Sequence, residues 1–281
     1  MIAQAQQDHP TIPISQLVAL FGVSRSWYYA RPTVTQDDEA MALRDAIEQI
    51  ALAFPGYGYR RVTKQLTRDG WTVNHKRVLR IMREESLLCQ LKRHFVSTTD
   101  STHGYRRYPN RLKELTIDRL DQVWVADITY IRLPTSFVYL ATLLDAYSRR
   151  CVGWHLAPTI DTGLTLTALE QALRTRQPTA GLVHHSDQGV QYASSAYVAR
   201  LEAVGIEISM AAVGNPYENA QAESFFKTLK REEVYLNDYQ SLAEAKANLA
   251  QFIDDVYNTK RLHSSLGYRP PAEFEARWRT H

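Results

Sequence analysis

Three carboxylates of this 281-residue chain have the surroundings that metal-dependent chemistry needs. Asp127 lies inside the apolar run at residues 123–131, Asp187 follows a short apolar run, and 35 residues separate Asp187 from Glu223 on a predicted helix. A buried, ionised carboxylate is costly unless a cation or hydrogen-bond donors meet it. Two strands and a helix can bring three such groups onto Mg²⁺, which binds carboxylates, waters and phosphate oxygens. Two ions held in this way can activate an attacking oxygen and stabilise the leaving oxygen of a phosphodiester.

Each carboxylate also has a structural interpretation. Asp127 could be held by hydrogen bonds alone, and Asp187 could form an Asx turn before Gly189. Glu223 and Lys227 are four residues apart, a spacing that allows a salt bridge on a helix surface. For each position taken alone both interpretations stay open, and it is the set of three that favours a metal site.

The helix that carries Glu223 follows a Gly-Asn-Pro breaker at residues 214–216. Its apolar positions recur at i, i+3, i+4 and i+7 and form one stripe, made of Ala222, Phe225, Phe226 and Leu229. At about 100° per residue, Glu223, Lys227 and Lys230 lie together along one flank of that stripe. We therefore expect Lys230 to point at phosphate near the carboxylates, with Lys227 beside it.

Other polar residues are given structural roles or a choice of roles. Asp145, in Leu-Leu-Asp-Ala-Tyr-Ser, ends a predicted strand and is interpreted as the cap of the following turn rather than as a metal ligand. His184 and His185 belong to a short predicted strand, where we expect hydrogen-bonded structural roles. Arg261 and His263 follow a helix in a basic loop, and we expect them to contact DNA or to support the active site.

Apolar runs bounded by breakers predict the elements that would position these side chains. Strands are expected at residues 123–131, 137–144, 151–156, 182–185 and 206–209, and further helices at 162–176, 194–204 and 242–257. The first strand is apolar on both faces, as a central strand is. Three meandering strands followed by alternating helices and strands predict an α/β core of ribonuclease-H-like order over residues 119–275.

Positive charge is concentrated before this core. Residues 54–113 contain ten arginines and four lysines against four acidic residues, a net charge of +10, whereas the whole chain has a net charge of +3. A solvated charged surface is one explanation. A basic segment joined to an acidic remainder is better explained by a module that binds nucleic acid.

Two helical segments are predicted in front of the core. In residues 1–36, Ser15 is expected to cap a helix that Gly22 ends, and a second helix would present Arg25 to DNA, as in a helix-turn-helix. Residues 37–90 predict a second helical DNA-binding segment with helices at 37–53, 60–69 and 74–85. Its candidate phosphate contacts are Arg60, Arg61, Lys76, Arg77 and Arg80. Residues 91–118 are interpreted as a basic linker.

Several classes of protein are disfavoured by the composition. The chain has no run of 18 apolar residues, and its N-terminus has neither the basic region nor the apolar region of a signal peptide. Cys89 and Cys151 are the only cysteines and have no metal-ligand spacing. These features predict a cytoplasmic protein.

Several motifs together resemble one protein family. They are Trp-Val-Ala-Asp at residues 124–127, His-Ser-Asp-Gln-Gly-Val-Gln-Tyr at 185–192, Asn-Pro-Tyr-Glu-Asn-Ala-Gln-Ala-Glu-Ser-Phe-Phe at 215–226, Tyr-Gly-Tyr-Arg-Arg at 57–61 and Tyr-Asn-Thr-Lys-Arg-Leu-His-Ser-Ser-Leu-Gly-Tyr-Arg-Pro at 257–270. Over residues 50–275 the chain resembles DDE-type transposases of the insertion sequence three family, in particular the second-frame product, whose integrase core is similar to retroviral integrase. The resemblance implies that Asp127, Asp187 and Glu223 are the catalytic, metal-binding triad and that Lys230 contacts DNA. Glu218 stands where the family often has Asp, a surface replacement.

The resemblance also implies an activity and its partners. A transposase of this kind would use two Mg²⁺ ions, or Mn²⁺ in their place, to cleave strands at element ends, and the freed 3′-hydroxyl would attack target DNA. It would act as a homo-oligomer on DNA in the bacterial nucleoid, alone or fused to an upstream-frame helix-turn-helix product. Two alternatives stay open: a sequence-specific DNA-binding regulator with a degenerate core, and a ribonuclease-H-like nuclease. The complete triad favours an enzyme over the regulator, and the two N-terminal helical segments favour the transposase over the nuclease.

Overall fold

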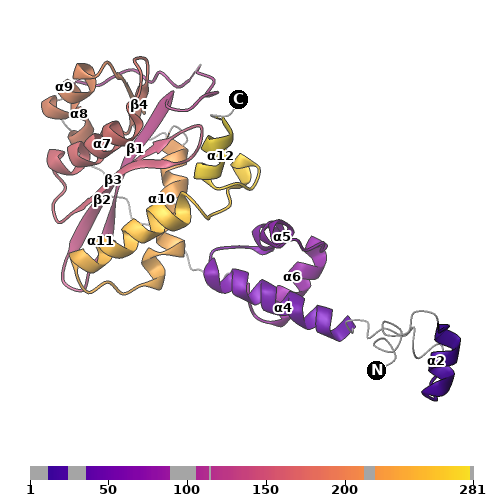
Figure 1. Cartoon of the computed structure of the whole chain (residues 1–281). Helices are drawn as coiled ribbons and strands as arrows, with labels where there is room; N and C mark the ends of the chain where they lie inside the picture. The colour runs from indigo at the N-terminus through magenta and orange to yellow at the C-terminus, as the bar shows by residue number, and fades with distance from the viewer. Residues whose placement is uncertain (1–11, 25–35, 89–105, 114, 212–218, 279–281) are drawn as a thin grey trace.

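The structure is a computed structural model that describes residues 12–24, 36–88, 106–113, 115–211 and 219–278. In chain order its parts are the short helix α2 (Ile14–Leu20), a group of three helices, and a sheet with helices on both faces (Figure 1). This order agrees with the prediction of helical segments in front of an α/β core.

The N-terminal helix α2 differs from the prediction at its start and agrees with it at its end. Pro13 occupies the N-cap position and no side chain caps the helix, so the predicted cap at Ser15 is wrong. Gly22 ends the helix with a φ of 64°, a conformation that glycine adopts without steric cost. Arg25 and the predicted second helix lie outside the described residues, so the first helix-turn-helix stays a prediction.

Three helices form the second helical segment: α4 (Gln36–Ala53), α5 (Tyr59–Arg68) and α6 (His75–Glu84). They confirm the three predicted helices to within a few residues. The side chain of Asn74 caps α6 by accepting a hydrogen bond from the backbone N–H of Lys76 at 2.8 Å. Apolar residues from all three helices pack into one cluster that includes Leu43, Ile47, Val62, Leu66, Val78 and Met82.

The helical segment and the core are joined by contacts between distant parts of the chain. The backbone N–H of Leu262 donates a hydrogen bond of 2.7 Å to the hydroxyl of Tyr57, and the Leu262 side chain packs into the helical cluster. Arg68 of α5 forms an ion pair of 2.7 Å with Glu273. The described part of the predicted linker also contacts the core, because the backbone N–H of Arg111 donates to the Ser209 hydroxyl at 2.9 Å.

The core contains a five-stranded sheet in the order β3-β2-β1-β4-β5. The strands are β1 (Val123–Arg132), β2 (Phe137–Asp145), β3 (Cys151–Ala157), β4 (Val183–Ser186) and β5 (Glu207–Met210). The first three are antiparallel neighbours, and β4 and β5 run parallel to β1, which is the ribonuclease-H-like order that the sequence predicts. The register of β1 with β4 spans residues 123–125 of β1, so the two strands diverge before Asp127.

Each face of the sheet carries its own apolar core. On one face lie α7 (Thr162–Arg176), α8 (Val190–Ala193) and α9 (Ser195–Ala203); α7 lies so close to β3 that a Cβ at Gly153 would be 2.3 Å from the carbonyl oxygen of Ala168. On the other lie α10 (Ala220–Glu232) and α11 (Leu242–Ala250). The predicted apolar stripe of α10 is confirmed, since all four of its residues are buried: Ala222, Phe225, Phe226 and Leu229.

The C-terminal elements depart from the prediction. The single helix expected at residues 242–257 is α11 followed by a π-helical stretch, η3 (Gln251–Tyr257). The helices α8 and α12 (Pro271–Trp278) were not predicted. Within the described residues, none of the helices has both the length and the apolar character that a membrane span requires.

Candidate active site

Asp127 lies in the middle of β1, opposite Thr142 of β2, and its side chain is half-buried. Its Oδ1 accepts a hydrogen bond from the backbone N–H of Ile128 at 2.8 Å. Burial, followed by the negative charge of Asp187 and to a smaller extent that of Glu223, raises the pKa of Asp127 to about 8. The protein therefore holds this carboxylate where a cation would stabilise its charged form.

Asp187 follows β4, beside the point where β1 and β4 diverge. The backbone N–H of Gly189 donates a hydrogen bond of 3.0 Å to its Oδ1, which confirms the Asx turn. The turn does not exclude a metal-binding role, because the same carboxylate raises the pKa of Asp127. A Cβ at Gly189 would lie 2.9 Å from Oδ1, so glycine leaves the carboxylate in its place.

Glu223 lies in the first turn of α10 and is exposed, as is Lys227. Both residues are described and no ion pair joins them, so the salt bridge that their spacing allows is not formed. Among the described residues, no three His, Cys, Asp or Glu side chains lie close enough together to hold a metal ion. The structure thus brings Asp127 and Asp187 together and leaves Glu223 at a distance from which it acts on Asp127 through its charge.

Lys230 lies two turns after Glu223 on α10. Its Nζ is 4.7 Å from the centroid of the Tyr130 ring on β1, a cation–π contact. Burial lowers the pKa of Lys230, and the negative charge of Asp127 raises it in part. The ammonium group therefore stands within electrostatic range of the carboxylate on β1.

His184 and His185 have the structural roles that the sequence predicts. The Nε2 of His184 and the hydroxyl of Tyr197 are hydrogen-bonded at 2.9 Å, and the Nδ1 of His185 and the hydroxyl of Ser209 at 2.8 Å. Burial lowers the pKa of His184 to about 3, so this ring is neutral at physiological pH. These two hydrogen bonds join β4 to α9 and to β5.

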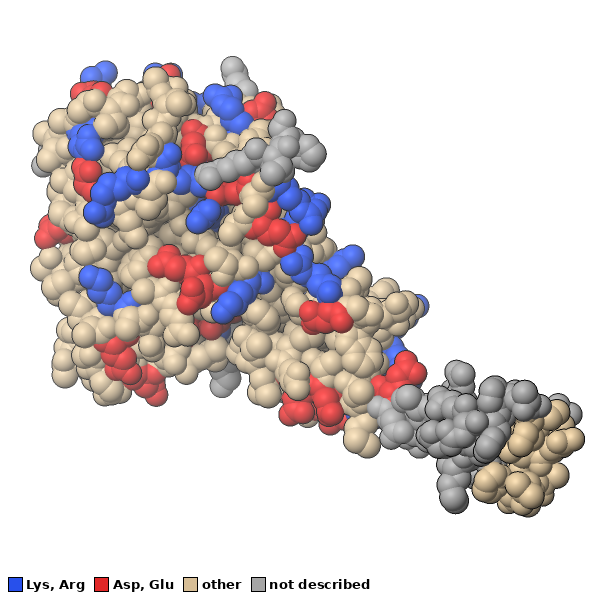
Figure 2. All heavy atoms as spheres, in the orientation of Figure 1, with Lys and Arg blue, Asp and Glu red and all other residues tan. Residues whose placement is uncertain are grey.

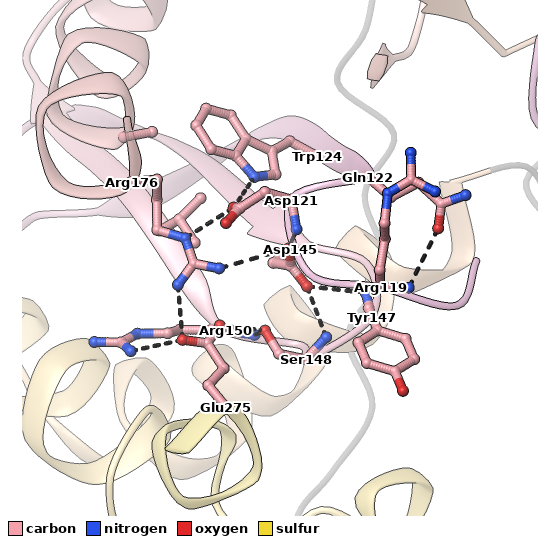
Figure 3. Close-up of polar contacts among 12 residues, drawn as sticks. Arg119, Asp121, Gln122, Trp124, Asp145, Tyr147, Ser148, Arg150, Arg176 and Glu275 are labelled. Carbon is pink, nitrogen blue, oxygen red and sulfur yellow. Dashed lines mark hydrogen bonds and ion pairs between the residues drawn. The ribbon is translucent and has the colours of Figure 1, made fainter. Parts of the chain in front are cut away.

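Asp145 is the turn cap that the sequence predicts. It is buried at the end of β2, where its Oδ1 accepts hydrogen bonds from the backbone N–H groups of Tyr147 at 3.0 Å and Ser148 at 2.7 Å. Its Oδ2 accepts a third, of 2.6 Å, from the backbone N–H of Asp121 (Figure 3). Three donors satisfy this carboxylate without any metal.

Arg176, in the last turn of α7, extends this network to the C-terminus of the chain (Figure 3). Its side chain is 4% exposed, donates to Asp121 at 2.8 Å and to Glu275 of α12 at 2.7 Å, and lies 3.8 Å from Oδ2 of Asp145. This cluster was not predicted from the sequence. Its only local signal is a basic residue at a helix end, which is common, while Asp121 and Glu275 lie 55 and 99 residues away.

Arg261 and His263, for which two roles were predicted, are both buried. Arg261 is 3% exposed and forms two hydrogen bonds to Glu232 at the end of α10, at 2.6 and 2.7 Å. His263 is buried with its ring centroid 4.8 Å from that of Tyr257, and burial and the charge of Arg261 lower its pKa to about 3. Both side chains thus support the elements around α10, and their contact with DNA stays a prediction.

The cations of the helical segment differ in exposure. Arg61 is half-buried, with its guanidinium 5.6 Å from the centroid of the Tyr57 ring, and burial lowers its pKa. On the face shown in Figure 2, basic and acidic side chains are interspersed rather than gathered into one patch. The remaining predicted DNA contacts of α5 and α6 are exposed: Arg60, Lys76, Arg77 and Arg80.

Known protein families match three parts of the chain. Residues 118–216 match the model of an integrase core domain, residues 204–271 match a second model with that description, and residues 36–95 match an HTH-like domain. The first two matches contain all three predicted triad residues. The third contains α4, α5 and α6.

Curated relatives are similar over nearly their whole length. The "Insertion element IS600 uncharacterized 31 kDa protein" of Shigella sonnei is 37% identical over 265 residues, which cover 92% of this chain and 97% of that protein. The "Transposase for insertion sequence element IS904" of Lactococcus lactis is 36% identical, over 88% of this chain and 98% of that one. The "Transposase InsF for insertion sequence IS3A" of Escherichia coli is 31% identical, over 93% of each chain.

Solved structures are more distant. The catalytic core domain of HTLV-2 integrase in complex with magnesium has a TM-score of 0.43 and 14% identity, over 55% of this chain and 95% of that one. The catalytic domain of Mos1 transposase with Raltegravir and Mg has a TM-score of 0.41 and 15% identity, over 48% and 72% of the two chains. The family is therefore shown by the sequence relatives: the chain belongs to the IS3 family of transposases, DDE-type enzymes with an integrase core that cleaves and transfers DNA strands.

Proposed function

We propose that this chain performs DNA cleavage at the ends of its insertion element, and strand transfer by the freed 3′-hydroxyl, at a site formed by Asp127, Asp187 and Glu223. The observation that carries the proposal is the position of Asp127. It is held in a central strand and accepts a hydrogen bond from Ile128, and burial, followed by the charges of Asp187 and Glu223, raises its pKa to about 8. Without metal this carboxyl group is therefore mostly protonated at neutral pH, and a divalent cation would stabilise its charged form.

The donor set fits Mg²⁺, a hard ion that takes carboxylate oxygens together with waters and phosphate oxygens. When bound, a pair of such ions supplies activation of the attacking oxygen and stabilisation of the leaving oxygen. Asp127, Asp187 and Glu223 would hold these ions. Glu223 has to come closer to the two aspartates than it lies in this structure for all three carboxylates to share the ions.

Lys230 would hold a phosphate of the DNA beside the carboxylates. Its ammonium group is half-buried against Tyr130 and within range of Asp127, so it can offset phosphate charge at a defined place. Lys227, one turn earlier and exposed, would contact the backbone further out. Neither side chain takes part in the exchange of bonds; both orient the strand.

The helical segment would supply most of the affinity for element ends. Its exposed cations on α5 and α6 can neutralise phosphates, and this electrostatic contribution to the binding free energy does not depend on base sequence. Because both ends of an element must be joined to one target, we propose that at least two copies act together on DNA in the nucleoid. Fusion to an upstream-frame product would add a further DNA-binding helix-turn-helix.

Glu223→Gln tests the site assignment, since it keeps the shape of an exposed side chain and removes its charge. The variant should keep the melting temperature and the affinity for element-end DNA, and lose cleavage and strand transfer in Mg²⁺. The assay is cleavage of a labelled element-end duplex, with the fused form measured beside the isolated chain. Wild-type cleavage by the fused Glu223→Gln protein would show that Glu223 is not part of the site.

A further inference from the structure

A pocket of about 550 Å³ opens beside Asp187 on the face of the sheet that α7 and α8 cover. Its floor is formed by β1 and β2, with Tyr130 on the first strand and Phe137 and Tyr139 on the second. Ile160 and Gln191 form its walls. A volume of this size is that of a small-ligand pocket and is too small to enclose a DNA duplex.

The rings in this pocket are available for stacking. Tyr130 and Phe137 lie on one face of neighbouring strands with their centroids 5.5 Å apart in an edge-to-face arrangement. Phe137 is 48% exposed, far more than an aromatic residue of a core strand, and Ile160 is also exposed. Exposed aromatic faces in a groove are the surfaces on which unpaired bases stack, whatever their sequence.

The position of the pocket selects this ligand over others. Asp187 belongs both to the pocket wall and to the proposed metal site, and Lys230 holds its ammonium group over the ring of Tyr130. A phosphate held between them would place the attached nucleoside at the pocket mouth. Tyr192, also in the lining, has a buried hydroxyl with no hydrogen-bond partner among the described residues, which a ligand or a water could satisfy.

We propose that this pocket binds one unpaired base of the element-end DNA, next to the phosphate that is cleaved. The inference rests on the proposed function, since the phosphate position comes from the triad and Lys230. A base inside the duplex cannot reach the floor of the pocket, so the base leaves the stack on binding, and stacking against Phe137 and Tyr130 offsets the cost. The pocket thereby sets which phosphate lies at the carboxylates.

The test is a double-mutant cycle in which a side chain of the protein and a base of the DNA are removed, separately and together. The affinity of the full chain for a fluorescein-labelled element-end duplex is measured by anisotropy in EDTA, with an abasic site at each nucleotide flanking the cleaved phosphate in turn. Phe137→Ala and the correct abasic site should each weaken binding about fivefold or more. Combined, they should weaken it no further than either change alone, because each removes one half of the same contact.

The controls separate this inference from the proposed function. Trp278→Ala removes a ring of similar exposure, 44%, outside the pocket, and its effect should multiply with that of every abasic site. Phe137→Tyr should keep the coupling. No base occupies the pocket if the effect of Phe137→Ala on affinity multiplies with that of the abasic site at every position. The same conclusion follows if Phe137→Ala changes only the oligomeric state of the DNA-free protein. A failure of the proposed function differs, because the wild-type chain would then show neither Mg²⁺-dependent cleavage nor preference for element ends.

Discussion

Asp127 and Asp145 lie on neighbouring strands of one sheet, but their carboxyl groups have different hydrogen-bond and charge partners. Burial raises the pKa of both carboxyl groups. Asp145 accepts three backbone hydrogen bonds and has Arg176 beside it, whereas Asp127 accepts one and faces two further carboxylates. Burial therefore does not distinguish the proposed catalytic aspartate from the structural one. What distinguishes them is whether the protein supplies the partners of the charge.

The surroundings of the two aspartates show the same difference in how charges are paired. At the end near Asp145, the charges of Arg176, Asp121 and Glu275 are paired with one another, and they fasten α12 to the strands (Figure 3). Around Asp127, the negative charges of Asp187 and Glu223 add to the effect of burial on its pKa, and the ammonium group of Lys230 lies 4.7 Å from an aromatic ring. The polar groups around Asp145 are paired within the protein and stabilise the fold, whereas those around Asp127 are proposed to bind a ligand.

Matched substitutions at the two aspartates should show the largest difference. Asp127→Asn should lower the cleavage rate about a thousandfold or more, because metal-ion stabilisation of several kcal/mol is lost. Asp145→Asn should keep the rate per folded molecule. The measurement is single-turnover cleavage of an element-end duplex in Mg²⁺.

The melting temperatures should change in the opposite order. Asp127→Asn replaces a carboxyl group whose charged form is disfavoured by burial and by Asp187, so its melting temperature without metal should equal or exceed that of the wild type. Asp145→Asn replaces an acceptor by an amide that cannot accept the bond from Asp121 N–H, at a cost of about 1–3 kcal/mol. Mg²⁺ should stabilise the wild type and Asp145→Asn but not Asp127→Asn. A loss of cleavage in Asp145→Asn at full folding would contradict the comparison.

The network at the structural end should show the next largest effect. Arg176→Met keeps much of the side-chain length and leaves Asp121 and Glu275 without their buried cation, which should cost about 3–5 kcal/mol of the free energy of unfolding. The matched control is Arg200→Met, which breaks a partly exposed ion pair with Glu170 and should cost less than about 1 kcal/mol. Urea unfolding of the three proteins measures both. Equal losses in the two variants would show that the buried network adds nothing beyond a surface pair.

Local patterns were sufficient to predict much of this fold. The apolar runs and breakers predict five strands in the correct order, and the period of α10 predicts its buried stripe. One short-range polar signal also holds, since Asp145 caps its turn as predicted, whereas the cap predicted at Ser15 is not formed. These features depend on neighbours within a few residues, which the sequence displays directly.

Features that depend on distant partners could not be predicted in the same way. The basic loop around Arg261 suggests DNA contact, but its guanidinium is paired with Glu232, 29 residues away, and Leu262 packs among the helices of the N-terminal segment. The family motif joins Glu223 to the two aspartates, yet its side chain is exposed in the structure and no three-carboxylate cluster forms among the described residues. A spacing fixes which residues belong to a site, and packing and ligands fix how close they come.

The smallest effect is expected in the helical segment, where paired and unpaired cations can be compared on α4 and α6. Arg77 is exposed and forms no ion pair with a described residue, whereas Arg44 pairs with Glu85 at 2.7 Å and Glu84 at 3.5 Å. If unpaired cations serve the DNA and paired ones serve the fold, Arg77→Ala should remove one phosphate contact. The slope of log affinity against log salt for element-end DNA should then fall by about 1, while Arg44→Ala leaves the slope unchanged.

Anisotropy titrations at several salt concentrations measure these slopes. Because the phosphate term is independent of sequence, Arg77→Ala should weaken binding to element ends and to unrelated DNA by the same factor. A larger loss on element ends alone would place Arg77 on a base edge instead. An equal change of slope in both variants would mean that the ion pairs of Arg44 open on DNA, and that pairing in the unbound protein does not mark a cation as structural on this surface.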